Sequence, residues 1–144
     1  MIKSYTFQTR WADMDPNGHL RHTAYNDYAA QVRINFLDEF DLPIHKLLQM
    51  GIGPILFRED TRFFKEIRLN ESITINCRLM AVKKDGVRWH FFHEFFKKDD
   101  ELAATILVEG AWLDLAKRKL GTLPKEMVES MMEKMPRTED FHWL

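Results

Sequence analysis

The chain has 144 residues, of which 45% are hydrophobic and 12% aromatic, enough to build one core without disulfides or metals. Its 21 Lys and Arg against 22 Asp and Glu give a formal net charge of −1, a balance without the basic excess that nucleic-acid binding needs. The 11 Phe and 4 Trp are many for this length, so we expect part of this apolar surface in an interface between copies of the chain.

The first half of the chain is predicted to form a strand, a long helix and a short helix. Alternating side chains in KSYTFQTRWA indicate the strand. After the turn sequences Asp-Pro and Asn-Gly at 15–18, apolar residues recur every three or four positions, which predicts an amphipathic helix over about 23–40. A short helical segment, IHKLLQM, follows and ends at Gly51.

The second half is predicted to form four strands and a final helix. Apolar and polar residues alternate in ILFREDTRFFKEI, ESITINCRLMAV, VRWHFFHEFFK and LAATILVEGAWLDL. Asp85-Gly86 favours a hairpin turn, and Gly110 indicates a bulge or a close backbone approach. Pro124 opens and Pro136 ends a methionine-rich helix, and we expect the last residues, FHWL, to dock on a neighbour or fray. This order predicts an α+β fold in which consecutive strands form an antiparallel meander against the long helix.

Two features bear on the cellular compartment. The single cysteine, Cys77, has no partner for an internal disulfide, which favours a reducing environment. The opening sequence MIKSYTFQTR lacks the apolar segment of a signal peptide, and no stretch reaches the roughly 18 apolar residues of a membrane span. We therefore expect a cytoplasmic protein with no membrane span.

The segment WADMDPNGHLRHTAY, residues 11–25, concentrates ionisable side chains immediately before the long helix. As pure structure, its two aspartates can accept backbone N–H groups in turns, and Asn17-Gly18 tolerates positive φ. Thr23, or less well His22, can cap the helix. An elaborate turn and helix cap is therefore one interpretation of the whole segment.

The same segment supports two chemical interpretations. His19 and His22 with the two aspartates offer acceptable metal ligands, but His19 precedes the helix and this spacing gives weak support, so no metal site is predicted. As a reaction centre, a carboxylate beside the unpaired N–H groups of a helix start can activate water or attack a carbonyl itself. Those N–H groups can then hold the developing oxyanion.

The segment RWADMDPNGHLRHTAY, followed by the long helix, resembles the signature of hotdog-fold acyl-CoA thioesterases of the 4-hydroxybenzoyl-CoA thioesterase type. Two later segments, RFFKEIRLNESITI and AWLDLAKRKLGTLP, are similar to later parts of that family in the same order. The resemblance covers about residues 3–136. It implies one hotdog domain over 1–144, with a curved antiparallel sheet wrapped around one central helix. It also implies dimers that join edge to edge, often paired into tetramers, with the acyl site between protomers.

The resemblance assigns roles to individual residues of the motif. Asp15 matches the catalytic aspartate, which acts as nucleophile or general base. His22 matches the position whose backbone N–H polarises the thioester carbonyl. Gly18 matches the turn glycine, His19 matches a histidine that orders the loop, and Tyr25 matches the tyrosine of the helix. These residues form the predicted catalytic and substrate-binding set.

Three further residues complete that set. Arg21 stands where relatives carry a small amide, and it either contacts a phosphate or carboxylate of the ligand or pairs with Asp13, a structural position. Glu59 and Thr61 are predicted to share a strand face that, in a hotdog dimer, approaches the helix start of the partner. A buried Glu59 needs a partner, so it either assists the attacking water or forms an ion pair with a nearby arginine.

These observations predict hydrolysis of an acyl-CoA thioester to a carboxylic acid and CoA, without metal or redox cofactor. The alternative is a non-catalytic module of the same fold that binds acyl-CoA or an acyl carrier protein. A hotdog dehydratase is a third possibility, but it needs a histidine–acid pair that the sequence does not reveal. The sequence leaves the acyl group open.

Overall fold

The computed structural model describes residues 2–144, and within them a single sheet surrounds one long helix. The strands are β1 (Lys3–Gln8), β2 (Ile52–Phe63), β3 (Ser72–Val82), β4 (Arg88–Phe96), β5 (Leu102–Asp114), β6 (Lys119–Leu120) and β7 (Arg137–Trp143). The helices are α1 (Ala24–Glu39), α2 (Ile44–Gln49) and α3 (Lys125–Lys134), with 3-10 turns η1 (Trp11–Asp13) and η2 (Lys98–Asp100). The predicted strand, long helix and four strands are confirmed in type and order.

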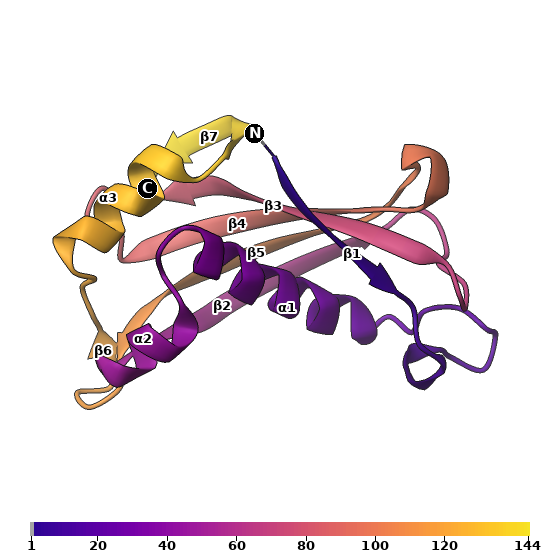
Figure 1. Ribbon diagram of the computed structural model, residues 1–144, viewed down its shortest axis with the longest axis horizontal. Helices are drawn as coiled ribbons and strands as arrows, with labels where there is room; N and C mark the ends of the chain where they lie inside the picture. The colour runs from indigo at the N-terminus through magenta and orange to yellow at the C-terminus, as the bar shows by residue number, and fades with distance from the viewer. Residues whose placement is uncertain (1) are drawn as a thin grey trace.

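The sheet has the order β1-β3-β4-β5-β2, and neighbours in that order run antiparallel. The predicted meander is wrong for β2, which pairs with β5 at the end of the sheet and not with β3, the next strand in the chain. The small strand β6 extends the sheet beside β5. The helix α1 lies along one face of the curved sheet, while α3 and β7 lie near one end of it (Figure 1). This arrangement, a curled antiparallel sheet around one central helix, is the hotdog fold that the sequence resemblance implied.

The core forms where the apolar stripe of α1 meets the sheet. Residues about one helical turn apart, among them Ala29, Val32 and Phe36, are fully buried, as the three-and-four spacing predicts. The Phe36 ring meets Phe91 of β4 edge to face, with ring centroids 5.7 Å apart. Burial of each such aromatic side chain contributes roughly 1.5–3 kcal/mol, so the orientation of α1 is strongly determined by this contact.

Gly110 on β5 marks a close backbone approach, as predicted. A Cβ atom there would lie 2.4 Å from the Ile55 carbonyl oxygen of β2 and 2.4 Å from the Trp89 ring of β4. The register between β2 and β5 shifts between Leu56 and Arg58, close to this point. The bulge lies on the partner strand, and the glycine makes room for its backbone.

The C-terminal segment forms a strand rather than fraying. β7 runs parallel to β3 and continues the line of β1 along the same edge of that strand. Its ends are tied by Leu79 N–H to the Pro136 carbonyl at 2.9 Å and by Leu144 N–H to the Val82 carbonyl at 3.0 Å. The sequence RTEDFHW has little alternation, so its strand character depends on the free edge of β3.

Across residues 2–144, no helix combines the length and the apolar character that crossing a bilayer requires.

Candidate active site

Asp15 lies in a tight turn that holds one of its carboxylate oxygens and leaves the other free. Its Oδ1 accepts the backbone N–H of Asn17 at 2.9 Å and of His19 at 3.0 Å. The turn is closed by Gly18 N–H to the Asp15 carbonyl at 3.1 Å, and Gly18 has φ of +77°, a region that glycine enters without strain. No hydrogen bond within residues 2–144 involves Oδ2. The turn chemistry predicted for this segment therefore orients a carboxylate with one oxygen available.

The start of α1 presents unpaired backbone N–H groups. Arg21 N–H donates to the Asp13 carbonyl at 2.8 Å and Ala24 N–H donates to the Arg21 carbonyl at 2.9 Å, but the intervening His22 N–H has no acceptor within residues 2–144. Thr23 makes no side-chain capping hydrogen bond, and its hydroxyl accepts a hydrogen bond from Arg21 Nε at 3.0 Å. An uncapped helix start carries partial positive charge, so the His22 amide is free to bind an anionic oxygen.

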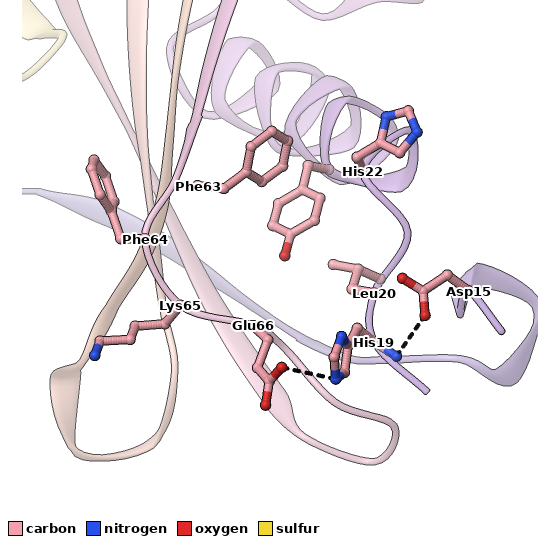
Figure 2. A pocket seen from close by; sticks show the side chains of 9 residues that line it. Asp15, His19, Leu20, His22, Phe63, Phe64, Lys65 and Glu66 are labelled. Carbon is pink, nitrogen blue, oxygen red and sulfur yellow. Dashed lines mark hydrogen bonds and ion pairs between the residues drawn. The ribbon is translucent and has the colours of Figure 1, made fainter. Parts of the chain in front are cut away.

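A cavity of about 340 Å³ lies beside this helix start. It is lined by residues of the motif and by the segment that follows β2: Asp15, His19, Leu20, His22, Tyr25, Phe63, Phe64, Lys65 and Glu66 (Figure 2). The lining thus joins apolar and aromatic side chains to charged ones, and Phe63 meets Tyr25 edge to face at 5.0 Å between ring centroids. A carboxylate, a helix-start amide and an apolar wall therefore border one space.

His19 links the motif loop to the segment after β2. Its Nε2 lies 2.8 Å from Oε2 of Glu66 (Figure 2), and the neighbouring Leu20 N–H donates to the Ile67 carbonyl at 2.6 Å. Arg68 also contacts Glu66, at 2.6 Å. The hydrogen bond from Arg68, together with the fields of Arg68 and His19, holds the pKa of the Glu66 carboxyl below its usual value. These contacts hold the Asp15 loop against the opposite wall of the cavity.

Tyr25 supplies a hydroxyl to the cavity. Its side chain is buried, and burial first, then the charge of Asp15, raises its pKa to about 12. The hydroxyl therefore stays protonated across the physiological range and can donate a hydrogen bond to a bound substrate.

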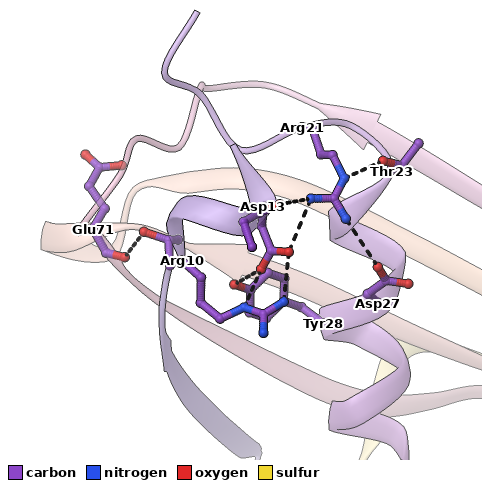
Figure 3. A network of polar contacts seen from close by, with 9 residues as sticks. Arg10, Asp13, Arg21, Thr23, Asp27, Tyr28 and Glu71 are labelled. Atoms are coloured by element: carbon purple, nitrogen blue, oxygen red, sulfur yellow. Dashed lines mark hydrogen bonds and ion pairs between the residues drawn. The ribbon is translucent and has the colours of Figure 1, made fainter. Parts of the chain in front are cut away.

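Arg21 and Asp13 belong to a separate polar network (Figure 3), and neither residue lines the cavity. Buried Asp13 accepts hydrogen bonds from Arg10 Nε at 2.9 Å, from the Tyr28 hydroxyl at 2.8 Å and from Arg21 Nη1 at 3.3 Å. Arg21 Nη1 also donates to the Ala12 carbonyl at 2.6 Å. The hydrogen bond from Arg10 is the main cause that lowers the pKa of Asp13 to about 2. Arg21 therefore pairs with Asp13, and its contact with a phosphate or carboxylate of a ligand stays a prediction.

Glu59, Thr61 and Gly18 lie outside the residues that line this cavity. Thr61 Oγ1 contacts Asn26 Oδ1 of α1 at 3.1 Å. Glu59 is exposed in this single copy, and no ion pair joins it to any residue of 2–144; its role beside the helix start of a partner stays a prediction. The bulge at Phe57 separates Ile55 from the face that Thr61 and Phe63 share, because an inserted residue changes which side chains share a strand face.

Sequence reasoning missed the segment from Phe63 to Glu66. Phe63 belongs to the alternating pattern of β2, and that pattern was a usable signal. Lys65 and Glu66 follow the end of the strand, where no local pattern indicates which distant loop they contact. Within residues 2–144, no three His, Cys, Asp or Glu side chains lie close enough together to hold a metal ion.

Several solved structures are similar to this chain. Among solved structures, a Staphylococcus aureus protein in complex with CoA is 19% identical, with a TM-score of 0.85 over 92% of this chain and 82% of that one. A 1,4-dihydroxy-2-naphthoyl-CoA thioesterase from Synechocystis is 16% identical, with a TM-score of 0.81 over 93% and 98% of the two chains. A gentisyl-coenzyme A thioesterase is 19% identical, with a TM-score of 0.80 over 90% and 99%.

At these identities the solved structures show a shared fold. No curated protein gives a significant sequence match. Residues 9–131 match the thioesterase-like superfamily, and this match includes the Asp15 loop, α1 and the sheet. The chain belongs to the thioesterase-like superfamily.

Proposed function

We propose that this chain hydrolyses acyl-CoA thioesters to a carboxylic acid and CoA. The observation that carries the proposal is the free oxygen of Asp15 and the unpaired His22 N–H at the border of one cavity. The names of three structurally similar proteins support the substrate class, since one was solved with CoA and two are CoA thioesterases. The finer resemblance to the 4-hydroxybenzoyl-CoA type stays a prediction.

The geometry suits a reaction at the thioester carbonyl. The carbonyl oxygen accepts the His22 N–H, and Asp15 Oδ2 takes a proton from a water molecule that attacks the carbonyl carbon. The tetrahedral intermediate then expels the CoA thiolate, which takes up the proton held by Asp15, and leaves the carboxylic acid. In the nucleophilic variant Asp15 attacks first and expels the thiolate, and water then hydrolyses the mixed anhydride. One base contributes about 10²–10⁴-fold and one oxyanion donor about 10²–10³-fold.

We also propose that the protein associates with itself through β2. This strand lies at the end of the sheet order, with β5 on one side only, and an unpaired strand edge is a template for pairing. Large apolar side chains on β2 and just after it are between 40% and 54% exposed: Leu56, Phe57, Phe63 and Phe64. Edge-to-edge pairing would cover them and place a second copy beside the cavity.

Asp15→Asn tests the proposed role of the carboxylate. The amide keeps the shape and can still accept the N–H groups of the turn, but it can neither accept a proton from water nor attack the carbonyl. We expect kcat to fall by at least about 10²-fold, measured as CoA release from a panel of aromatic and aliphatic acyl-CoAs.

Asp38→Asn, which removes an exposed carboxylate elsewhere on α1, is the matched control and should keep full activity. Full turnover by a folded Asp15→Asn variant would contradict the assignment. Binding of acyl-CoA without turnover by the unmodified protein would instead indicate a binding module.

A further inference from the structure

Arg33 of α1 is a buried cation without a counter-ion. Its side chain is 9% exposed, and no carboxylate of residues 2–144 lies within ion-pair distance of it. The contact that its guanidinium makes is with the ring of His93 on β4, at 3.2 Å from Nη1 to Nε2. The other ring nitrogen of His93, Nδ1, lies 2.9 Å from the Asn76 carbonyl oxygen. Because a carbonyl only accepts, Nδ1 carries the proton, and Nε2 accepts from Arg33.

His93 therefore positions the guanidinium without neutralising it. Burial, and secondarily the charge of Arg33, lowers the pKa of His93 to about 3, so the ring is neutral at physiological pH. Burial also lowers the pKa of Arg33, but a guanidinium does not lose its proton in a protein. The exposed carboxylate of Glu59 acts on Arg33 only through its field. An uncompensated buried charge is unfavourable, and a bound anion would relieve it.

A cavity of about 210 Å³ adjoins this guanidinium. It lies between α1, β2 and β4, and Arg33 is the charged residue among those that line it. Ala30 and Ile34 of α1, Pro54 of β2 and Trp89 of β4 supply apolar walls. A cavity with apolar walls and one oriented cation suits a ligand with an apolar body and an anionic end.

The cavity lies along the same helix as the proposed reaction centre. His22 and Arg33 are 11 positions apart in the chain, which corresponds to about 16 Å along a helix. Helical side chains lean toward the N-terminus, which shortens the distance to the guanidinium. Between the two cavities, which share no lining residue, the Thr61 hydroxyl donates to Asn26 Oδ1 and joins β2 to α1. An acyl chain that runs from the His22 amide past this contact, along the exposed edge of β2, would end near Arg33.

We propose that this cavity receives the far end of the acyl group and that Arg33 binds a carboxylate there. The preferred substrates are then acyl-CoAs whose acyl chain ends in a second carboxylate. This inference rests on the proposed function for the position of the thioester, but the binding of a carboxylate beside Arg33 does not depend on hydrolysis.

The first measurement compares kcat/KM for suberoyl-CoA and octanoyl-CoA, which have the same chain length and differ at the end of the acyl group. We expect the unmodified protein to favour suberoyl-CoA by about tenfold or more, the usual size of one charge-assisted contact. Arg33→Met replaces the cation with an apolar side chain and should reverse the preference. Arg33→Gln removes the charge but keeps a polar donor, and it replaces Arg33→Met in this comparison if the methionine variant does not fold. Lys125→Met, which removes an 88% exposed cation on α3, is the control and should keep the wild-type ratio.

The second measurement needs no turnover. Calorimetric titration with octanoate and with octanol compares a carboxylate with an uncharged group on the same chain. Octanoate should bind the unmodified protein about tenfold more tightly than octanol, and Arg33→Met should abolish that difference. Equal binding of the two, or a difference that persists in Arg33→Met, would overturn the proposal even if the protein is a thioesterase. An Arg33-dependent difference in a protein that hydrolyses no thioester would support the cavity and reject the proposed reaction.

Discussion

Asp13 and Asp15 are two positions apart in the motif, but they differ in hydrogen-bond partners and surroundings. Asp13 is buried and both of its oxygens accept hydrogen bonds from charged or hydroxyl donors. Asp15 accepts only backbone N–H groups, on one oxygen. The difference arises because Arg10, Arg21 and Tyr28 converge on Asp13, while Asp15 faces the cavity. Residue type is therefore insufficient to separate a structural carboxylate from a reactive one.

Asp13→Asn should destabilise the fold, because it removes the anionic partner of Arg10 and the nearer of the two carboxylates that contact Arg21. We expect the free energy of unfolding to fall by about 1–3 kcal/mol at neutral pH, measured by urea denaturation. The folded pKa of Asp13, about 2, lies below its ordinary value of 3.8. The stabilisation is therefore present above about pH 4 and is lost as the pH falls toward 2. A difference between variant and wild type that stays constant across that window would contradict this account.

At the scale of elements, the long helix and the main strands form where the local sequence pattern predicts them. The features that the local pattern does not predict occur where two strands pair. The bulge in β2 lies near Gly110 of β5 and breaks the alternation between Leu56 and Arg58. β7 forms because β1 covers only part of the β3 edge. Both features follow from pairing between distant segments, since neither has a period or turn signal of its own.

Gly110→Ala should destabilise the sheet through a steric clash, since the φ of Gly110 is one that alanine also adopts. The new Cβ would meet a carbonyl oxygen of β2 and an indole ring, neither of which can easily move. We expect a loss of about 1–3 kcal/mol in urea denaturation. Gly53→Ala is the comparison, because its Cβ would meet only the end of the flexible Leu115 side chain, at 3.1 Å. Equal losses in the two variants would show that strand entropy, not the close approach, controls the effect.

At the scale of the whole molecule, the fold leaves one sheet edge and the mouth of the proposed site on neighbouring surfaces. β2 ends beside the cavity that Asp15 and His22 border. Self-association through β2 would therefore bury the exposed apolar edge and restrict access of water to the site. The abundance of aromatic residues in the sequence agrees with such an interface.

Phe57→Glu tests the proposed association. Phe57 is 54% exposed on the free edge strand, and a carboxylate there would be desolvated and repelled by its symmetry mate. We expect the dissociation constant of the dimer to rise by about tenfold or more, measured by light scattering across a dilution series. Trp11→Glu, at a 75% exposed side chain outside β2, should leave the association unchanged. A dimer of unaltered stability in Phe57→Glu would place the interface elsewhere.

The sequence by itself determined the long helix near 23–40, the succession of strands along the chain and the turn around Asp15, because periodicity, turn preference and glycine φ act over a few neighbouring residues. The order of the strands within the sheet, with β2 beside β5, was decided by the tertiary structure. Only the tertiary structure decided that Arg21 faces Asp13, that Glu66 contacts His19 and that the edge of β3 takes up β7. It also decided that Arg33 meets His93, 60 positions away. Such contacts depend on how α1 seats in the curved sheet, and no local pattern encodes them. The physical reason is that hydrogen bonds and ion pairs form between side chains that packing of the core brings close together, even where they are far apart in the chain.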